Sequence, residues 1–186
     1  KNCKAIGRFG IGTDNIDIVL NELDALVNID LDRRVYLDKL KSLNIIRIGT
    51  SGAMQTDIPI DSILVSEYAV GLDALMAFYT YEASREEKAI LRAIVSQAPA
   101  FKPLKPYVCA ASKLLLRKIG KDLPRGITVT APGFYAPQGR ELRYTKSIPN
   151  FIKQLSSISK DNFRLTNLEM ETSGIYGLAN ILGHQA

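Results

Sequence analysis

The chain contains few of the residues on which most catalytic and metal sites depend. Of its 186 residues, only two are cysteine and one is histidine. Cys3 and Cys109 lie far apart and show no metal or redox spacing, and His184 lies in the final tail. No Ser/His/Asp order can be built on that histidine. We therefore expect two free thiols in a reducing cytoplasm, no metal site and no nucleophilic side chain.

Long apolar runs and clustered positive charge are also missing. No apolar stretch approaches the roughly 20 residues that a membrane-spanning helix needs, and the first residues do not read as a signal peptide. The formal net charge is +5, but no Lys/Arg run is interleaved with aromatic residues. We expect neither a membrane nor a nucleic-acid partner. The positive charge favours anionic ligands such as phosphate.

The composition is typical of an ordinary globular domain. Hydrophobic residues make up 46% and charged residues 23% of the chain, which argues against disorder. The chain begins without a methionine and ends abruptly at Ala186. We therefore expect residues 1–186 to form a single domain that is incomplete at both ends.

Helical and extended patterns alternate along the sequence. Apolar spacing predicts a helix capped by Asp14 or Asn15, a charged helical stretch around 35–40, and helices over 85–95, 107–119, 148–158 and 172–181. Extended segments are predicted over 44–48, over 58–70 in two pieces, and over 126–131. This alternation predicts an α/β fold with three α/β/α layers, in which helices flank a central mixed sheet.

A Gly/Pro-bent loop over 133–140 places Gln138 and Arg140 two residues apart, after the aromatic Phe134. On an extended segment these two side chains point the same way. An amide donates and accepts at adjacent positions, and a guanidinium donates to a carbonyl oxygen, which is the pattern that a uracil ring requires. For an isolated Q-x-R, a polar surface loop is the commoner explanation.

The segment 45–52 places Arg47 inside an otherwise apolar stretch, before Gly49, Thr50 and Ser51. A buried guanidinium must meet a carboxylate or a bound anion. Glycines let backbone N–H groups approach a ligand, and the hydroxyls add donors, so a phosphate cradle is one interpretation. An internal salt bridge beside a turn is the other. The glycine-rich segment 7–12 lacks dinucleotide spacing and predicts no cofactor site.

The segment 167–174 carries Glu169 and Glu171 on either side of Met170. Acidic residues before a helix are explained by the helix dipole alone. Alternatively, Glu171 accepts hydrogen bonds from a vicinal diol, and Met170 forms an apolar floor under a sugar ring.

Taken together, R-I-G-T-S-G at 47–52, F-Y-A-P-Q-G-R at 134–140 and N-L-E-M-E-T at 167–172 resemble three signatures of the nucleoside phosphorylase superfamily, in the same order. The similarity is strongest to its uridine phosphorylases, and the F-Y-x-x-Q-x-R loop is the most specific signature. The resemblance implies phosphate-dependent cleavage of uridine to uracil and ribose 1-phosphate by a pentosyltransferase of phosphorylase/hydrolase-like fold. It implies no cofactor, with inorganic phosphate as co-substrate.

The resemblance also implies a role for each matching residue. By this resemblance, Arg47, Gly49 and Thr50 bind phosphate, and Phe134, Gln138 and Arg140 bind uracil. Met170 and Glu171 bind ribose. Glu169 and Ser51 have supporting roles. Catalysis would rest on Arg47, Gln138 and Arg140, which orient the reactants and stabilise charge.

Parts of the family pattern have no counterpart in the sequence. These are the G-D-P-x-R loop, an N-terminal histidine, a phosphate arginine lent by a neighbouring subunit, and the region after the E-M-E helix. A lent arginine implies a homo-oligomer, either a dimer or a hexamer built as a trimer of dimers. Two alternatives stay open: a purine-directed or thioadenosine-directed relative, and a non-catalytic nucleoside-binding homologue.

Overall fold

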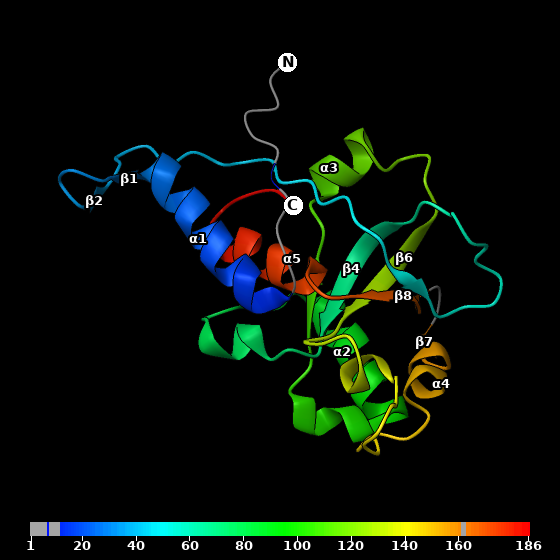
Figure 1. Ribbon diagram of the computed structural model, residues 1–186. Coiled ribbons are helices and arrows are strands. Elements are labelled where there is room, and N and C mark those ends of the chain that lie inside the picture. The colour runs from blue at the N-terminus through cyan, green and yellow to red at the C-terminus, as the bar shows by residue number, and fades with distance from the viewer. Residues whose placement is uncertain (1–6, 8–11, 161–162) are drawn as a thin grey trace.

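A mixed β-sheet forms the centre of the computed structural model, which describes residues 7, 12–160 and 163–186 (Figure 1). The strands of this sheet are β3 (Gly52–Ala53), β4 (Val65–Gly71), β5 (Tyr107–Ala110), β6 (Arg125–Thr130), β7 (Ser159–Lys160) and β8 (Phe163–Glu169). Their order is β3-β8-β6-β4-β5, and β7 pairs beside β8. The strands β4, β6 and β8 run parallel, whereas β3, β5 and β7 run antiparallel to their neighbours.

Burial on both faces explains why the central strands read as continuous apolar and β-branched runs. In β6, residues 127–130 are all buried, and they alternate aliphatic side chains with threonines. Parallel strands are covered by helices on both sides, so they do not show the alternation of a half-exposed strand. The 126–131 strand was predicted from this composition and is confirmed.

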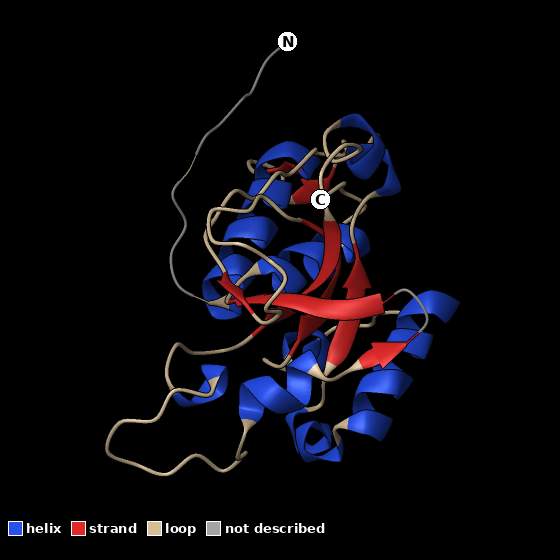
Figure 2. Cartoon of the chain, turned by 90° about the vertical axis from the view of Figure 1, so that its right-hand side faces the viewer, coloured by secondary structure: helices blue, strands red, loops and turns tan. Residues whose placement is uncertain are grey.

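Helices cover both faces of the sheet, as Figure 2 shows. They are α1 (Thr13–Asn28), α2 (Arg85–Gln97), α3 (Lys113–Lys118), α4 (Phe151–Ser156) and α5 (Thr172–Ile181), with short 3-10 helices η1 (Leu75–Phe78), η2 (Pro99–Leu104) and η3 (Ala136–Gln138). Ile94 of α2 and Leu155 of α4 share one core with Val129 of β6. Leu178 of α5 packs against Leu20 of α1 in a second core. The predicted three-layer α/β/α fold is confirmed.

The described helices include none that is both long and apolar enough to cross a membrane. Cys109 is a buried free cysteine, as predicted, and burial raises the pKa of its thiol to about 12. Cys3 and most of the glycine-rich segment 7–12 lie outside the described residues.

The predicted charged helix around 35–40 is wrong. The chain instead forms a hairpin of β1 (Ile29–Asp30) and β2 (Val35–Tyr36). The Asp30 carboxylate accepts hydrogen bonds from the backbone N–H groups of Asp32 and Arg33, which closes the turn. Local side-chain bonding of this kind competes with helix formation, and a charge pattern does not reveal it.

Four further predictions need correction. The helix predicted over 107–119 is divided into β5 and α3, because Ser112 caps α3 by accepting from the Leu115 N–H. The strand predicted over 44–48 is reduced to one bridge between Asn44 and Gln185. In the segment 58–70, only β4 from Val65 onward is extended. Finally, α1 begins after Gly12, and neither Asp14 nor Asn15 is its cap.

Candidate active site

The sheet topology brings the three sequence motifs to one edge. The parallel strands β6 and β8 are adjacent, so their carboxyl ends lie side by side. The loop 131–140 follows β6, and Met170 and Glu171 follow β8. The segment 47–51 joins them, because it leads into β3, where Gly52 pairs with Leu168. The carboxyl edge of a parallel sheet is where α/β proteins bind ligands.

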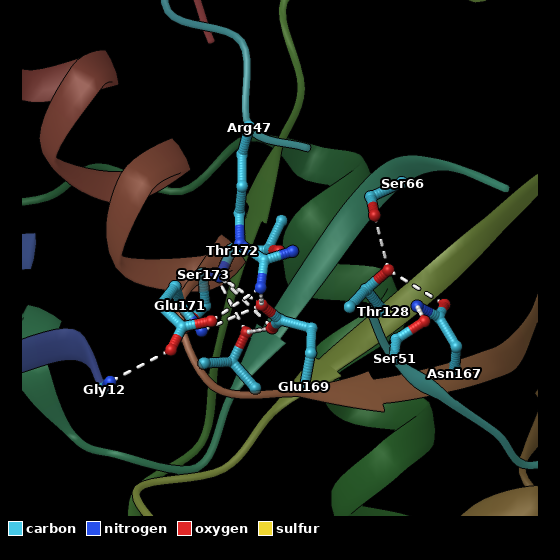
Figure 3. A network of polar contacts seen from close by, with 11 residues as sticks. Gly12, Arg47, Ser51, Ser66, Thr128, Asn167, Glu169, Glu171, Thr172 and Ser173 are labelled. Atoms are coloured by element: carbon cyan, nitrogen blue, oxygen red, sulfur yellow. Dashed lines mark hydrogen bonds and ion pairs between the residues drawn. The ribbon is translucent and has the colours of Figure 1, made fainter. Parts of the chain in front are cut away.

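Arg47 lies against both glutamates of the E-M-E segment (Figure 3). Its Nη2 atom is 3.1 Å from Glu169 Oε2 and 2.6 Å from Glu171 Oε2. The side chains of Arg47, Glu169 and Glu171 are 23%, 2% and 14% exposed. Arg47 was expected to meet a carboxylate or a bound anion, and it forms an internal salt bridge with two carboxylates. The segment that carries it is irregular rather than a strand.

Glu169 organises the turn between β8 and α5. Its carboxylate accepts from Thr130 Oγ1 at 2.6 Å and from the backbone N–H groups of Glu171 and Thr172. These donors, together with Arg47, satisfy a carboxylate that is almost fully buried. Glu169 therefore holds the start of α5 in place, which agrees with a supporting role.

Glu171 connects the site to the first helix. Glu171 Oε1 accepts from the Gly12 N–H at 3.0 Å, just before α1 begins. Glu171 Oε2 bonds Arg47, so the carboxylate ties together two segments distant in sequence. Met170 is half-buried between the two glutamates.

The hydroxyl and glycine residues after Arg47 are exposed at the same edge. A Cβ atom on Gly49 would lie within 2.9 Å of the Arg47 guanidinium, so a side chain there would displace the guanidinium from the glutamates. Ser51 Oγ accepts from Asn167 Nδ2 at 2.9 Å. Gly49, Thr50 and Ser51 are thus accessible to a ligand beside the Arg47 guanidinium, which is paired with Glu169 and Glu171.

Gln138 and Arg140 lie side by side, as predicted, but through a different backbone geometry. Arg140 Nη1 donates to Gln138 Oε1 at 2.6 Å and to the Phe134 carbonyl at 2.7 Å. The pairing arises from η3 and the left-handed Gly139 (φ 73°), not from an extended segment.

The three side chains of this loop differ in exposure. Gln138 is 7% exposed, whereas Phe134 is 54% exposed and Arg140 is also exposed. The Arg140 guanidinium carbon lies 3.9 Å from the Phe134 ring centroid, a cation–π contact at the surface. Gln138 is therefore buried while its two neighbours in the motif face solvent, and the left-handed turn at Gly139 separates the two environments.

A sequence profile of the phosphorylase superfamily matches residues 3–186. The chain belongs to the phosphorylase superfamily. A uridine phosphorylase from Thermococcus kodakarensis is 30% identical over 141 residues, which is 76% of this chain and 44% of that protein. A nucleoside phosphorylase from Trypanosoma brucei, described as showing uridine phosphorylase activity, superposes with a TM-score of 0.84 at 29% identity.

The Trypanosoma brucei match covers 96% of this chain and 66% of that one. The phosphorylase fold is also shared with more distant structures. The uridine phosphorylase from Schistosoma mansoni has a TM-score of 0.57 at 23% identity, over 96% of this chain and 56% of that one. The chain thus spans only part of the length of the phosphorylases that it matches.

A polar cluster next to the candidate site was not foreseen from the sequence. Asp73, just after β4, accepts from Tyr107 OH at 2.9 Å and from Ser173 Oγ at 3.0 Å. Burial raises the pKa of the Tyr107 hydroxyl, and the charge of Asp73 adds to the shift. The Ser173 N–H donates to Thr130, which bonds Glu169. An acidic residue two positions after the end of a strand was the signal that could have identified Asp73.

Proposed function

We propose that the protein is a nucleoside phosphorylase that cleaves uridine with inorganic phosphate to uracil and ribose 1-phosphate. The observation that carries this proposal is the Gln138–Arg140 pair beside Phe134, on a loop at the same sheet edge as Arg47 and the E-M-E turn. A planar amide next to a guanidinium matches the donors and acceptors of uracil.

The proposed chemistry needs no nucleophilic side chain. A phosphate oxygen forms a bond to C1′ of the ribose while the bond from C1′ to N1 of uracil breaks, and its electron pair leaves with the base. Arg47, Gly49 and Thr50 would orient the phosphate, with the Arg47 charge balancing that anion. A phosphate that approaches Arg47 would share the guanidinium with Glu171.

The other half of the site would hold the nucleoside. Gln138 and Arg140 would donate to uracil as negative charge develops on it, and the Phe134 ring would pack against the base. Glu171 would accept from the ribose hydroxyls, with Met170 beneath the sugar. Catalysis in this scheme is orientation plus charge stabilisation at both ends of the breaking bond.

Three properties of the whole protein belong to the same proposal. It would act in pyrimidine nucleoside salvage and catabolism, in the cytoplasm, as a homo-oligomer that is a dimer or a trimer of dimers. The 30% identity to a uridine phosphorylase and the 29% identity to a nucleoside phosphorylase with that activity support the substrate assignment.

The test is an assay of the full-length protein with uridine in the presence and absence of phosphate. We expect uracil release to require phosphate and to yield ribose 1-phosphate in equal amounts. Inosine and methylthioadenosine serve as the comparison substrates. Uracil release at the same rate without phosphate, giving free ribose, would indicate a hydrolase. Preference for a purine substrate would overturn the uridine assignment, and failure to cleave any nucleoside would indicate a binding homologue.

A further inference from the structure

A series of hydrogen-bonded polar side chains crosses the sheet and ends at the exposed Ser51. Asn167 of β8 is 6% exposed, and its Nδ2 donates to Ser51 Oγ at 2.9 Å (Figure 3). On the other side, Asn167 Oδ1 accepts from Thr128 Oγ1 and from Thr166 Oγ1, each at 2.9 Å. Thr128 in turn bonds Ser66 of β4. The contacts therefore span β4, β6 and β8.

These hydrogen bonds fix which way the Asn167 amide faces. Its oxygen accepts from the Thr128 hydroxyl, and the single Thr166 hydrogen is shared between that oxygen and the Ile127 carbonyl; both threonines are 1% exposed, and the amide nitrogen is directed at Ser51. A buried polar network is costly unless every member is bonded, and in return it holds its members in one arrangement. β3 adds to this rigidity, because Ala53 pairs with Asn167 itself.

The direction of the last hydrogen bond has a chemical consequence. A serine hydroxyl has one hydrogen and two acceptor lone pairs. Because Asn167 donates to Ser51 Oγ, the Ser51 hydrogen does not have to serve that contact and is available to another acceptor. Ser51 is exposed and follows Gly49 and Thr50, so that acceptor can be a ligand oxygen.

We propose that Asn167 is a positioning residue for phosphate, acting through the Ser51 hydroxyl, which donates to a phosphate oxygen. This inference rests on the proposed function, because it takes the segment 47–51 as the phosphate-binding segment. It adds two residues to that proposal. Ser51 contacts phosphate through its hydroxyl, and the buried Asn167 directs the hydrogen of that hydroxyl toward phosphate.

The test measures binding of inorganic phosphate to the full-length protein by calorimetry, for wild type, Ser51→Ala, Asn167→Ala and the double variant. Ser51→Ala removes a hydrogen bond to a charged ligand and should weaken phosphate binding about 10- to 100-fold. Asn167→Ala leaves the Ser51 hydroxyl in place but no longer orients it. This variant should weaken phosphate binding about 3- to 10-fold. The double variant should resemble Ser51→Ala within about 2-fold, because Asn167 acts through Ser51.

Folding is not expected to obscure the result. Ser51 is exposed, and both threonines keep another partner after Asn167→Ala, namely the Ile127 carbonyl for Thr166 and Ser66 for Thr128. Gln55→Ala is the matched control. It removes an amide that bonds the Leu165 carbonyl of the same strand, away from the segment 47–51, and should leave phosphate affinity unchanged.

Steady-state kinetics give an independent reading of the same variants. With uridine as substrate, Ser51→Ala and Asn167→Ala should raise KM for phosphate and leave KM for uridine within about 2-fold, a split that general loosening of the fold would not produce. Unchanged phosphate affinity in both variants would overturn the inference, as would additive losses in the double variant or no phosphate binding in wild type. Phosphate binding that depends on Ser51 and Asn167, in a protein that does not cleave uridine, would support this inference and refute the substrate assignment.

Discussion

Gln138 and Arg140 are two residues apart, yet the first is buried and the second is exposed. The buried amide receives the Arg140 guanidinium on its oxygen. This contact orients the amide, so its nitrogen can be directed at a ligand. A buried side chain with a fixed orientation is well suited to a specificity role, and the Arg140 guanidinium is itself held by Gln138 and the Phe134 carbonyl. At the scale of single residues, substitutions of Gln138 and Arg140 are therefore the direct test of uracil binding.

We expect Gln138→Ala to lower turnover of uridine by about 100- to 1000-fold, because one preorganised donor to a developing charge is lost. Arg140→Ala should cost at least as much, since its contact to the base would be charge-assisted. Steady-state rates with saturating phosphate measure both effects. Gln97→Ala, an exposed glutamine on α2, is the control and should behave as wild type. Activity within a few-fold of wild type in the Gln138 and Arg140 variants would contradict the proposed base contacts.

Arg47 contributes to stability as well as to the site. Arg47→Met removes the cation beside the buried Glu169 carboxylate and should lower the free energy of unfolding by about 1.5–3 kcal/mol. Urea denaturation at neutral pH measures this loss. Arg47→Lys keeps the charge and should lose less. The control is Arg164→Met, whose partner Asp57 is largely exposed, so its removal should matter less. If Arg47→Met lost no more stability than Arg164→Met, the Arg47 pair would contribute no more to the fold than an exposed pair.

At the scale of elements, sequence patterns were reliable where the local signal and the tertiary environment agreed. The helix over 172–181 and the strand at β6 are examples, since their apolar residues face packed layers. Sequence patterns failed at 107–119. There a buried strand and a short helix are both apolar, and hydrophobic periodicity does not distinguish them. The patterns also failed at the Asp30 turn, where hydrogen bonds to one side chain determine the backbone conformation.

The candidate site could be predicted only in part, because its contacts depend on strand pairing as well as on local sequence. Arg47 was expected to meet a carboxylate because burial of a lone charge is costly, but the identity of its partners depends on how β3 pairs with β8. The hydrogen bond of Asn167 to Ser51 depends on the same pairing. Contacts between residues more than 100 positions apart are set by strand order, which the local pattern does not contain.

The start of α2 offers a prediction at this scale. Ser84 Oγ accepts from the Glu87 N–H at 3.2 Å, and Glu87 Oε2 accepts from the Ser84 N–H at 2.6 Å, which is a capping box. Ser84→Ala should lower the free energy of unfolding by about 1 kcal/mol and leave phosphate affinity unchanged, because α2 lies outside the proposed site. Thermal or urea unfolding provides the measurement. The control is Ser96→Ala in the last turns of the same helix, which should have almost no effect.

At the scale of the whole molecule, two exposed isoleucines flank Arg47 in the proposed phosphate segment. Ile46 and Ile48, the neighbours of Arg47 in sequence, are 57% and 95% exposed. Large exposed apolar side chains next to a site are typical of surfaces that are covered in an assembly. This observation agrees with the proposal that a second copy of the chain completes the phosphate site.

We therefore expect the full-length protein to be at least a dimer, with activity that depends on assembly. Ile48→Asp would place a charge on this surface and should shift the protein toward monomer, as measured by analytical sedimentation, with a parallel loss of uridine cleavage. Leu31→Asp, a change at the exposed β1–β2 turn, is the control for adding one charge at an exposed leucine. It should alter neither property. If Ile48→Asp is monomeric and fully active, the site is complete within one chain. If wild type itself sediments as a fully active monomer, the exposure of Ile46 and Ile48 needs a different explanation and the assembly proposal is wrong.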